Sequence, residues 1–353
     1  MPEEICLTDL GEWELIRRLG AFAPPNQFVD DGAMVQLDKT GTEESPRAAC
    51  GVVISTDVLV EGLHFNDTTM DGEDVGWKAA TANLSDLAAM GCHRALGLTI
   101  GLVAPPSTPW KWVEAVYRGM KHALEHFGGE LLGGDCSGGK ERILAVTALG
   151  HLPSVDSGAI RRTDGQPGDV LVCTGPHGLS RLGLALLLND PDFRRINQLL
   201  PKDDARHLYC RARQAHQRPR PRFDAVQLLE TTRPTDQAWR VAGCDSSDGL
   251  AAAVTAIATA SGCGAVLERH ALPLVEEIAH IDLAEKWCLS GGEDFELVLA
   301  LEPAWASTVV ERLPGATQIG ELVKTSMPGL LYWKPGGEAL VPSDCGYSHF
   351  QRI

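Results

Sequence analysis

The chain lacks long apolar runs, paired cysteines and a signal-like start. No apolar stretch approaches the ~18 residues that a membrane-spanning helix needs, and the strongest runs, Leu182 to Leu188 and Ala251 to Ala260, are typical of buried helices. Met1-Pro2-Glu3-Glu4 has neither the basic start nor the apolar core of a signal peptide. The ten cysteines are irregularly spaced and include no Cys-x-x-Cys pair. We therefore expect free thiols in a reducing cytoplasm.

Basic residues are also scarce. The 31 lysines and arginines face 47 acidic residues, and the net charge of −16 argues against a nucleic-acid or anionic-membrane surface. Arg206 to Arg222 is the one basic island, with six arginines and little aromatic interleaving. Nucleic acid stays open as its partner, but we expect acidic patches of this chain or of a partner subunit. The polar insert Asp38 to Arg47 predicts an exposed hairpin or disordered loop, with no function assigned.

Several catalytic signatures are missing. The sequence contains no Gly-x-Ser-x-Gly elbow, no recognisable Ser/His/Asp triad and no dinucleotide fingerprint opening a helix. Acyl transfer through a serine and hydride transfer are therefore disfavoured. The zinc-binding pattern His-Glu-x-x-His is absent as well, and oxygen ligands suit magnesium better than zinc.

What the chain does contain is a set of short acidic motifs at the edges of apolar runs. Gathered carboxylates repel one another unless cations neutralise them, so the set predicts a magnesium site that holds a phosphorylated ligand. The motifs are Val29-Asp30-Asp31-Gly32, Ser55-Thr56-Asp57, Asn83-Leu84-Ser85-Asp86-Leu87, Gly133-Gly134-Asp135, Asp245-Ser246-Ser247-Asp248-Gly249 and Gly291-Gly292-Glu293-Asp294.

The length of 353 residues predicts two domains, which we place at 1–152 and 153–353 because Pro and Gly punctuate the polar stretch after residue 152. Both halves mix helices and strands. Periodicity and end signals predict strands at 51–56, 96–103, 142–149, 169–174, 295–301 and 317–320, and helices at 74–90, from Pro109 to Phe127, 179–188 and 250–261.

The segment Gly133 to Glu141 nearly matches a phosphate-binding P-loop. It fails because Glu141 replaces the required Ser or Thr and a strand, not a helix, follows. With Asp135 inside this segment, phosphate can approach only when a metal lies between the two anions. A plain tight turn is the alternative.

Four further residues have structural alternatives. Ser247 or Asp248 could simply cap the helix that follows, although Asp245 is not needed for a cap and favours the metal interpretation. Asp86 lies in an otherwise apolar helix and must find a cation or hydrogen-bond donors. His64, taken alone, is more often a structural histidine.

Together these segments resemble the thiamine-monophosphate kinases, and the resemblance spans nearly the whole chain. The order of the motifs is specific, whereas Gly-Gly-Asp or Ser-Asp-Gly-Leu alone would be weak. The segments are Asp30-Asp31-Gly32-Ala33, Ser55 to Phe65, Asn83 to Gly91, Gly133-Gly134-Asp135, Gln166-Pro167-Gly168-Asp169, Ser247 to Leu250, Ser290 to Leu297 and Gly346 to Phe350.

The resemblance implies the two-domain aminoimidazole ribonucleotide synthetase-like fold, with an α/β N-terminal domain that pairs with its twin in a homodimer and an α+β C-terminal domain that completes each site. It implies ATP-dependent phosphorylation of thiamine monophosphate to thiamine diphosphate, with Asp57, Asp86 and Asp135 as catalytic residues. The implied cofactor is magnesium, as several ions, and the implied ligands of these ions are Asp31, Ser55, Thr56, Asp57, Asp86, Asp135, Asp245 and Asp248. The implied nucleotide contacts are Gly134, Asp135, Arg162 and Ser247, and the implied substrate contacts are His64, Glu293 and Tyr347.

Departures from the family pattern are modest. Cys136-Ser137 follows Gly-Gly-Asp where threonines are usual, and Ser246 replaces an apolar residue. The Asp38 to Arg47 insert and the Arg206 to Arg222 segment, which we interpret as a long arginine-rich loop, also exceed the compact family pattern. Two other functions stay open at this point. One is a superfamily relative that activates a carbonyl oxygen or selenide with ATP, and the other is a non-catalytic nucleotide-binding scaffold.

Overall fold

The structure is a computed structural model that describes residues 6–24, 28–36, 51–152, 158–334 and 336–340. The Asp38 to Arg47 insert and Tyr347 lie outside the described residues. No helix in the described part of the chain is long and apolar enough to cross a bilayer.

The N-terminal half contains a five-stranded sheet in the order β1-β2-β5-β3-β4. Strands β3 and β4 run parallel, and the other neighbours are antiparallel. The strands are β1 (Ala33–Gln36), β2 (Gly51–Val60), β3 (Ala95–Ala104), β4 (Glu130–Gly138) and β5 (Ile143–Leu152).

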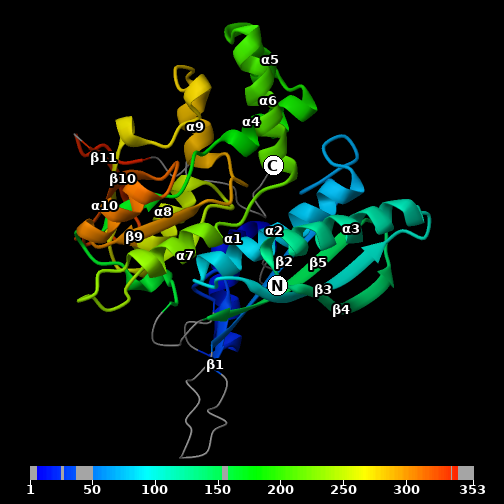
Figure 1. The fold of residues 1–353 in the computed structure, drawn as a ribbon, viewed down its shortest axis with the longest axis horizontal. Coiled ribbons are helices and arrows are strands. Elements are labelled where there is room, and N and C mark those ends of the chain that lie inside the picture. The colour runs from blue at the N-terminus through cyan, green and yellow to red at the C-terminus, as the bar shows by residue number, and fades with distance from the viewer. Residues whose placement is uncertain (1–5, 25–27, 37–50, 153–157, 335, 341–353) are drawn as a thin grey trace, which may run out of the picture.

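Helices α2 (Gly72–Ala89) and α3 (Trp110–Phe127) cover one face of this sheet (Figure 1). They approach closely because each brings a glycine to the contact: a Cβ at Gly76 would meet the carbonyl oxygen of Val116 at 1.8 Å, and one at Gly119 would meet that of Glu73 at 1.9 Å. Asp71 caps α2 by accepting a 2.9 Å hydrogen bond from the Asp74 amide. The helix pair thus holds α2 firmly against the sheet.

The C-terminal half contains a six-stranded sheet in the order β11-β8-β10-β6-β9-β7. It is antiparallel except where β11 pairs with β8. The strands are β6 (Val170–Cys173), β7 (Ala242–Asp245), β8 (Gly264–Glu268), β9 (Leu297–Leu301), β10 (Thr317–Val323) and β11 (Leu331–Lys334).

Both faces of the second sheet are buried, as the wholly apolar β9 shows. Leu297, Leu299 and Leu301 join a core that also includes α2, α3 and the first sheet, whereas Val298 and Ala300 join the core under α8 (Leu250–Ala260). This division follows from the two-residue period of a strand. The first core is continuous across the two halves, so α2 is buried between them.

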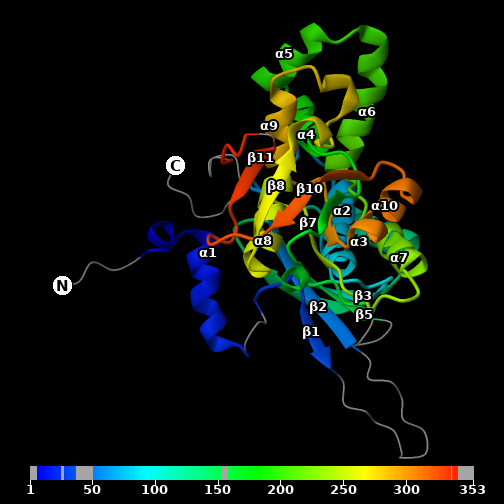
Figure 2. The ribbon, with the colours of Figure 1, turned by 90° about the vertical axis from the view of Figure 1, so that its left-hand side faces the viewer.

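The remaining helices complete the covering of the two sheets. Helices α4, α5, α6 and α9 share a third apolar cluster and project from the second sheet (Figure 2). The helices not yet bounded are α1 (Leu7–Leu19), α4 (Leu179–Leu188), α5 (Pro191–Leu199), α6 (Lys202–Gln217), α7 (Phe223–Thr232), α9 (Leu283–Ser290) and α10 (Pro303–Arg312).

All ten elements predicted from the sequence are present, with ends shifted by a few residues. Two local interpretations are wrong. Gly133 to Gly138 is part of strand β4 and not a tight turn, because its backbone pairs with β3. Most of the supposed arginine-rich loop is helix α6, whose apolar residues Leu208 and Ala212 are buried in the third cluster.

Candidate active site between the two sheets

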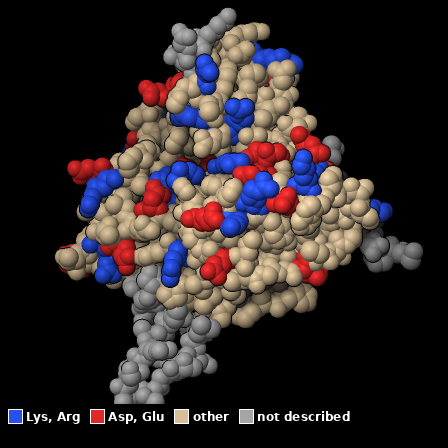
Figure 3. All heavy atoms as spheres, turned by 45° about the vertical axis from the view of Figure 1, so that its right-hand side comes forward, with Lys and Arg blue, Asp and Glu red and all other residues tan. Residues whose placement is uncertain are grey.

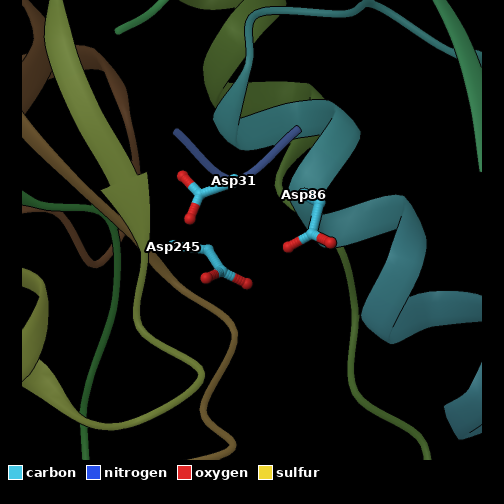
Figure 4. Close-up of side chains that lie close together, drawn as sticks. All are labelled: Asp31, Asp86 and Asp245. Carbon is cyan, nitrogen blue, oxygen red and sulfur yellow. The ribbon is translucent and has the colours of Figure 1, made fainter. Parts of the chain in front are cut away.

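Three carboxylates converge where the two halves of the chain meet. Asp31 precedes β1, Asp86 lies on α2 and Asp245 ends β7. Each offers one oxygen within 4.8 Å of the other two, and Figure 4 shows the three groups directed toward a common space. Residues from both halves of the chain therefore form one potential metal site.

Neighbouring donors hold these carboxylates in place. The Ser85 hydroxyl donates to Asp245 Oδ2 at 2.7 Å, and the Ser55 hydroxyl donates to Asp86. Arg162 forms an ion pair with Asp31 and also donates its backbone amide to Asp30 Oδ1 at 2.8 Å.

The acidic cluster has fewer cations than its charge requires. Burial, opposed by the attraction of Arg162 and aided by repulsion from Asp245, raises the pKa of Asp31 to about 7. Burial also raises the pKa of Asp86 well above its usual range, with repulsion from Asp57 and Asp245 adding to the effect. Such shifts mean that ionisation of the whole set is unfavourable without a compensating charge.

One buried oxygen supports a metal directly. Asp31 Oδ2 is buried and has no hydrogen-bond partner among the described residues. An unpaired carboxylate oxygen in the interior is costly, whereas a hard divalent cation uses carboxylate oxygens as its ordinary ligands. The donor set of Asp31, Asp86 and Asp245 therefore fits magnesium.

Asp57 is placed beside this cluster by β2. Its amide donates to the Asn83 side chain on α2 at 3.1 Å. Burial and repulsion from Asp248 and Asp31 raise its pKa to about 6. Alternation along the strand places Ser55 on the side of α2, while the Thr56 hydroxyl contacts Thr147 on β5 at 2.9 Å, on the opposite face. The sequence predicted that Asp57 follows its strand, but β2 continues to Val60.

A cavity of about 390 Å³ adjoins these carboxylates. It brings together five of the predicted site residues: Asp57, His64, Ser247, Asp248 and Glu293. Its apolar lining includes Leu59, Leu63, Phe65, Leu184 and Phe295. A cavity that is lined by both acidic groups and apolar side chains, and that adjoins a potential metal site, suits a ligand that carries both a phosphate and a ring.

Two of the lining residues have defined local contacts. His64 Nδ1 accepts a 3.0 Å hydrogen bond from the Val60 amide, which makes Nε2 the protonated nitrogen of a neutral ring. Burial, together with repulsion from Glu12 of α1, raises the pKa of Asp248 to about 6.

The Gly-Gly-Glu-Asp motif divides its two acids between different tasks. Asp294 accepts hydrogen bonds from the backbone amides of Gly178 at 2.7 Å and Ser180 at 3.0 Å, so it holds the start of α4. Glu293 lines the cavity instead. Only the first acid of this pair is therefore available to a ligand.

Other predicted residues do not join the cluster within one chain. Asp135 lies on β4, which is exposed along its whole length. Gly134, beside it, is packed so closely on β3 that a Cβ would meet the Ile100 carbonyl oxygen at 1.9 Å. Strands β5 and β3 separate β4 from β2, so at ~4.8 Å per strand Asp135 lies on the order of 14 Å from Asp57.

Sequence reasoning missed two residues of the cavity, Lys78 and His216. Lys78 Nζ on α2 lies 2.5 Å from Glu293 Oε1, and His216 Nδ1 on α6 lies 3.3 Å from Oε2. The one available signal was a lysine within the small and apolar residues of α2, which must find an anion when buried. The sequence does not say which anion.

The arginine-rich segment meets acidic residues of this chain, as expected. Arg211 pairs with Glu277 at 2.6 Å, Arg218 pairs with Asp74 at 2.6 Å, and Arg222 pairs with Asp224 and Glu296. Figure 3 shows basic and acidic side chains intermingled on one face. These carboxylates neutralise part of the positive charge of the segment.

Comparison with known proteins assigns both halves to one family. The model described as AIR synthase related protein, N-terminal domain, matches residues 29–152, and its C-terminal counterpart matches residues 166–332. The chain is 41% identical to the thiamine-monophosphate kinase of Prochlorococcus marinus, covering 98% of this chain and 97% of the relative. It is also 41% identical to that of Synechococcus elongatus, covering 98% of each.

A solved structure gives the same result for the fold. The structure described as AaThiL complexed with AMPPCP and TMP superimposes with a TM-score of 0.78 at 26% identity, and the match covers 98% of this chain and 99% of that one.

Proposed function

The chain belongs to the thiamine-monophosphate kinases of the AIR synthase-related family, and we propose that it uses the acidic cluster and the adjoining cavity for its reaction. The enzyme phosphorylates thiamine monophosphate with ATP and forms thiamine diphosphate. The observation that carries the proposed site is the convergence of Asp31, Asp86 and Asp245 beside a partly apolar cavity.

We propose magnesium as the cation at this site. Asp31, Ser55, Asp57, Asp86, Asp245 and Asp248 would hold it, with Thr56 contributing its backbone carbonyl because its hydroxyl faces away. Bound magnesium screens the phosphate charges and aligns donor and acceptor. The pKa values of Asp57 and Asp245, each raised to about 6 chiefly by burial, support this assignment because buried carboxylates are costly to ionise without a nearby cation.

We propose that the two substrates occupy opposite ends of the site. Ser247 and Arg162 would contact the nucleotide, and Arg162 is already oriented by its ion pair with Asp31. His64 and Glu293 would contact the thiamine part, since both line the cavity with Phe65 and Phe295. Tyr347 stays a proposed substrate contact from the resemblance alone.

Phosphate transfer would be direct. Ser55 and Ser85 donate to Asp86 and Asp245, and Ser180, beside His216, is buried. These contacts favour structural roles for the serines, and the carboxylates are better used as metal ligands than as nucleophiles. The acceptor is itself an anionic phosphate that needs little general-base help. The residues of the site would therefore act by positioning the two phosphates in line.

We also propose that two chains form a dimer through the first sheet. Within the described part of the chain, helices cover one face of this sheet and not the other, and the edge strand β4 is exposed throughout. Leu96, Leu131, Leu132 and Val58 are large apolar residues exposed on its strands, and exposed edges and apolar patches need cover. In such a dimer, the partner subunit's Asp135 would complete the metal site that it cannot reach within its own chain.

The division into 1–152 and 153–353 is likewise our proposal, supported by the separate sheets. All eight described cysteines are free, five of them buried, which supports a reducing compartment and leads us to propose the cytoplasm.

The test of the function is product formation. Purified protein with ATP, magnesium and thiamine monophosphate should yield thiamine diphosphate and ADP in equal amounts. Unphosphorylated thiamine serves as the control acceptor and should give no product, since the proposed site places a phosphate beside the cluster. ATP turnover without thiamine diphosphate would instead favour another reaction of the superfamily, and the absence of any turnover would favour a scaffold.

A further inference from the structure

Glu293 contacts two residues that belong to none of the family motifs, one from each half of the chain. Lys78 on α2 belongs to the first half of the chain, and its Nζ lies 2.5 Å from Glu293 Oε1. His216 on α6 belongs to the second half, and its Nδ1 lies 3.3 Å from Oε2 and 3.1 Å from the Ser180 hydroxyl. Lys78, His216 and Glu293 all line the cavity, and Lys78 is only 2% exposed.

We propose that Lys78 and His216 are positioning residues that fix Glu293 as the hydrogen-bond acceptor for the exocyclic amino group of the substrate's pyrimidine ring. The inference rests on the proposed function, because it takes the cavity as the thiamine site.

The backbone at Glu293 shows that its orientation is imposed. Glu293 has φ of 58° and Phe295 has φ of 52°, both in the left-handed region that side chains disfavour. The Glu293 amide donates a 2.6 Å hydrogen bond to the Ser247 carbonyl oxygen. Unfavourable backbone conformations persist when the surroundings determine them, and they gather at ligand sites. Here they turn the carboxylate toward Lys78 and the cavity.

The charges around Glu293 favour its role as a hydrogen-bond acceptor over a role as an uncompensated anion. The Lys78 ammonium compensates the Glu293 carboxylate, and its attraction, against the opposing effect of burial, holds the Glu293 pKa well below its usual range. Burial lowers the pKa of His216, which favours the neutral ring. A carboxylate has about four acceptor sites, and two neighbours leave room for another donor. The ring of the substrate would lie against Phe65 and Phe295, with its amino group at Glu293.

The test compares thiamine monophosphate with the analogue in which a ring carbonyl oxygen replaces the exocyclic amino group. Wild-type enzyme should prefer the amino substrate in kcat/KM, because the analogue offers no amino donor to Glu293. Lys78→Met should lower this preference by at least about tenfold while leaving KM for ATP nearly unchanged, since it releases the acceptor. Lys111→Met, which removes an exposed lysine from α3, is the matched control and should keep the wild-type preference.

A double variant separates positioning from a general structural role. Lys78→Met combined with Glu293→Gln should show the same preference as Glu293→Gln alone, because Lys78 acts through Glu293. An unchanged substrate preference in Lys78→Met would overturn the proposal, and so would a double variant whose loss of preference is the product of the two single losses.

If Lys78→Met lacks a cooperative melting transition, His216→Asn takes its place in the same comparison of single and double variants. If that also fails to fold, an unchanged preference in Glu293→Gln overturns the proposal. Failure of the function itself is distinct, because wild-type protein would then form no thiamine diphosphate.

Discussion

The hydroxyl of Ser85 on α2 donates a 2.7 Å hydrogen bond to Asp245 Oδ2 at the end of β7, joining residues 160 positions apart. This bond connects the helix that covers the first sheet with a strand of the second. The acidic cluster therefore exists only when both halves of the chain are folded against each other. Domain packing and metal binding should consequently depend on one another.

The first prediction concerns stability in the absence of divalent cations. The pKa of Asp31 is raised to about 7 and those of Asp57 and Asp245 to about 6, all from 3.8. Between about pH 4 and about pH 7 these three groups bind more protons in the folded state than in the unfolded state, so their contribution to the free energy of unfolding should fall as pH rises across this interval. Each pKa unit corresponds to about 1.4 kcal/mol.

Thermal melts in EDTA should show this decrease. Excess magnesium with a non-hydrolysable ATP analogue should flatten it, because ligand binding stabilises the ionised carboxylates. Asp245→Asn should remove part of the slope. A melting temperature that rises across the same interval in EDTA would contradict the proposed cluster.

The sequence predicted the individual site residues better than their arrangement in space. Periodicity located α2, and Asp86, among the small and apolar residues of this helix, already required a cation or hydrogen-bond donors. Three-dimensional convergence of Asp31, Asp86 and Asp245 could be expected only from the resemblance, since spacing along the chain does not determine contacts between sheets. Strand β4 was missed because Gly133 and Gly134 favour turns locally, while pairing with β3 decides their conformation.

The second prediction is a dimer that depends on the first sheet. Sedimentation at micromolar concentration should give about twice the chain mass of 37.9 kDa. Leu132→Arg on β4 should shift the protein toward monomer because a buried, unpaired charge opposes association. Leu199→Arg on α5 is the matched control, since the two leucines are 52% and 54% exposed. A fully active wild-type monomer would exclude this assembly.

The third prediction follows from the position of Asp135. If the partner subunit's Asp135 completes each site, Asp135→Asn and Asp86→Asn homodimers should both be inactive, but a mixed dimer should contain one intact site. Random co-assembly should then restore about one quarter of wild-type activity, since half the dimers are mixed and half their sites are intact. The measurement is turnover of co-expressed, differently tagged chains. If isolated mixed dimers recover no turnover, Asp135 does not act in the site of the partner chain, and this proposal is wrong.

The fourth prediction is that no phosphoenzyme forms. Enzyme incubated with γ-labelled ATP and magnesium, but without acceptor, should carry no label after quenching in acid or in base, because direct transfer requires the acceptor phosphate. Adding thiamine monophosphate should move the label into thiamine diphosphate. Stoichiometric protein-bound label that chases into product would refute direct transfer.

The most direct test of the account is the turnover of Asp57→Asn and Asp86→Asn during a magnesium titration. Each substitution preserves side-chain size but removes a charge from the cluster. We expect a loss of at least about a hundredfold in the rate of thiamine diphosphate formation, with the melting transition retained, because aligned metal ligands supply much of phosphoryl-transfer catalysis. Near-normal rates in either variant at saturating magnesium would contradict the central claim that these carboxylates hold the metal for the reaction.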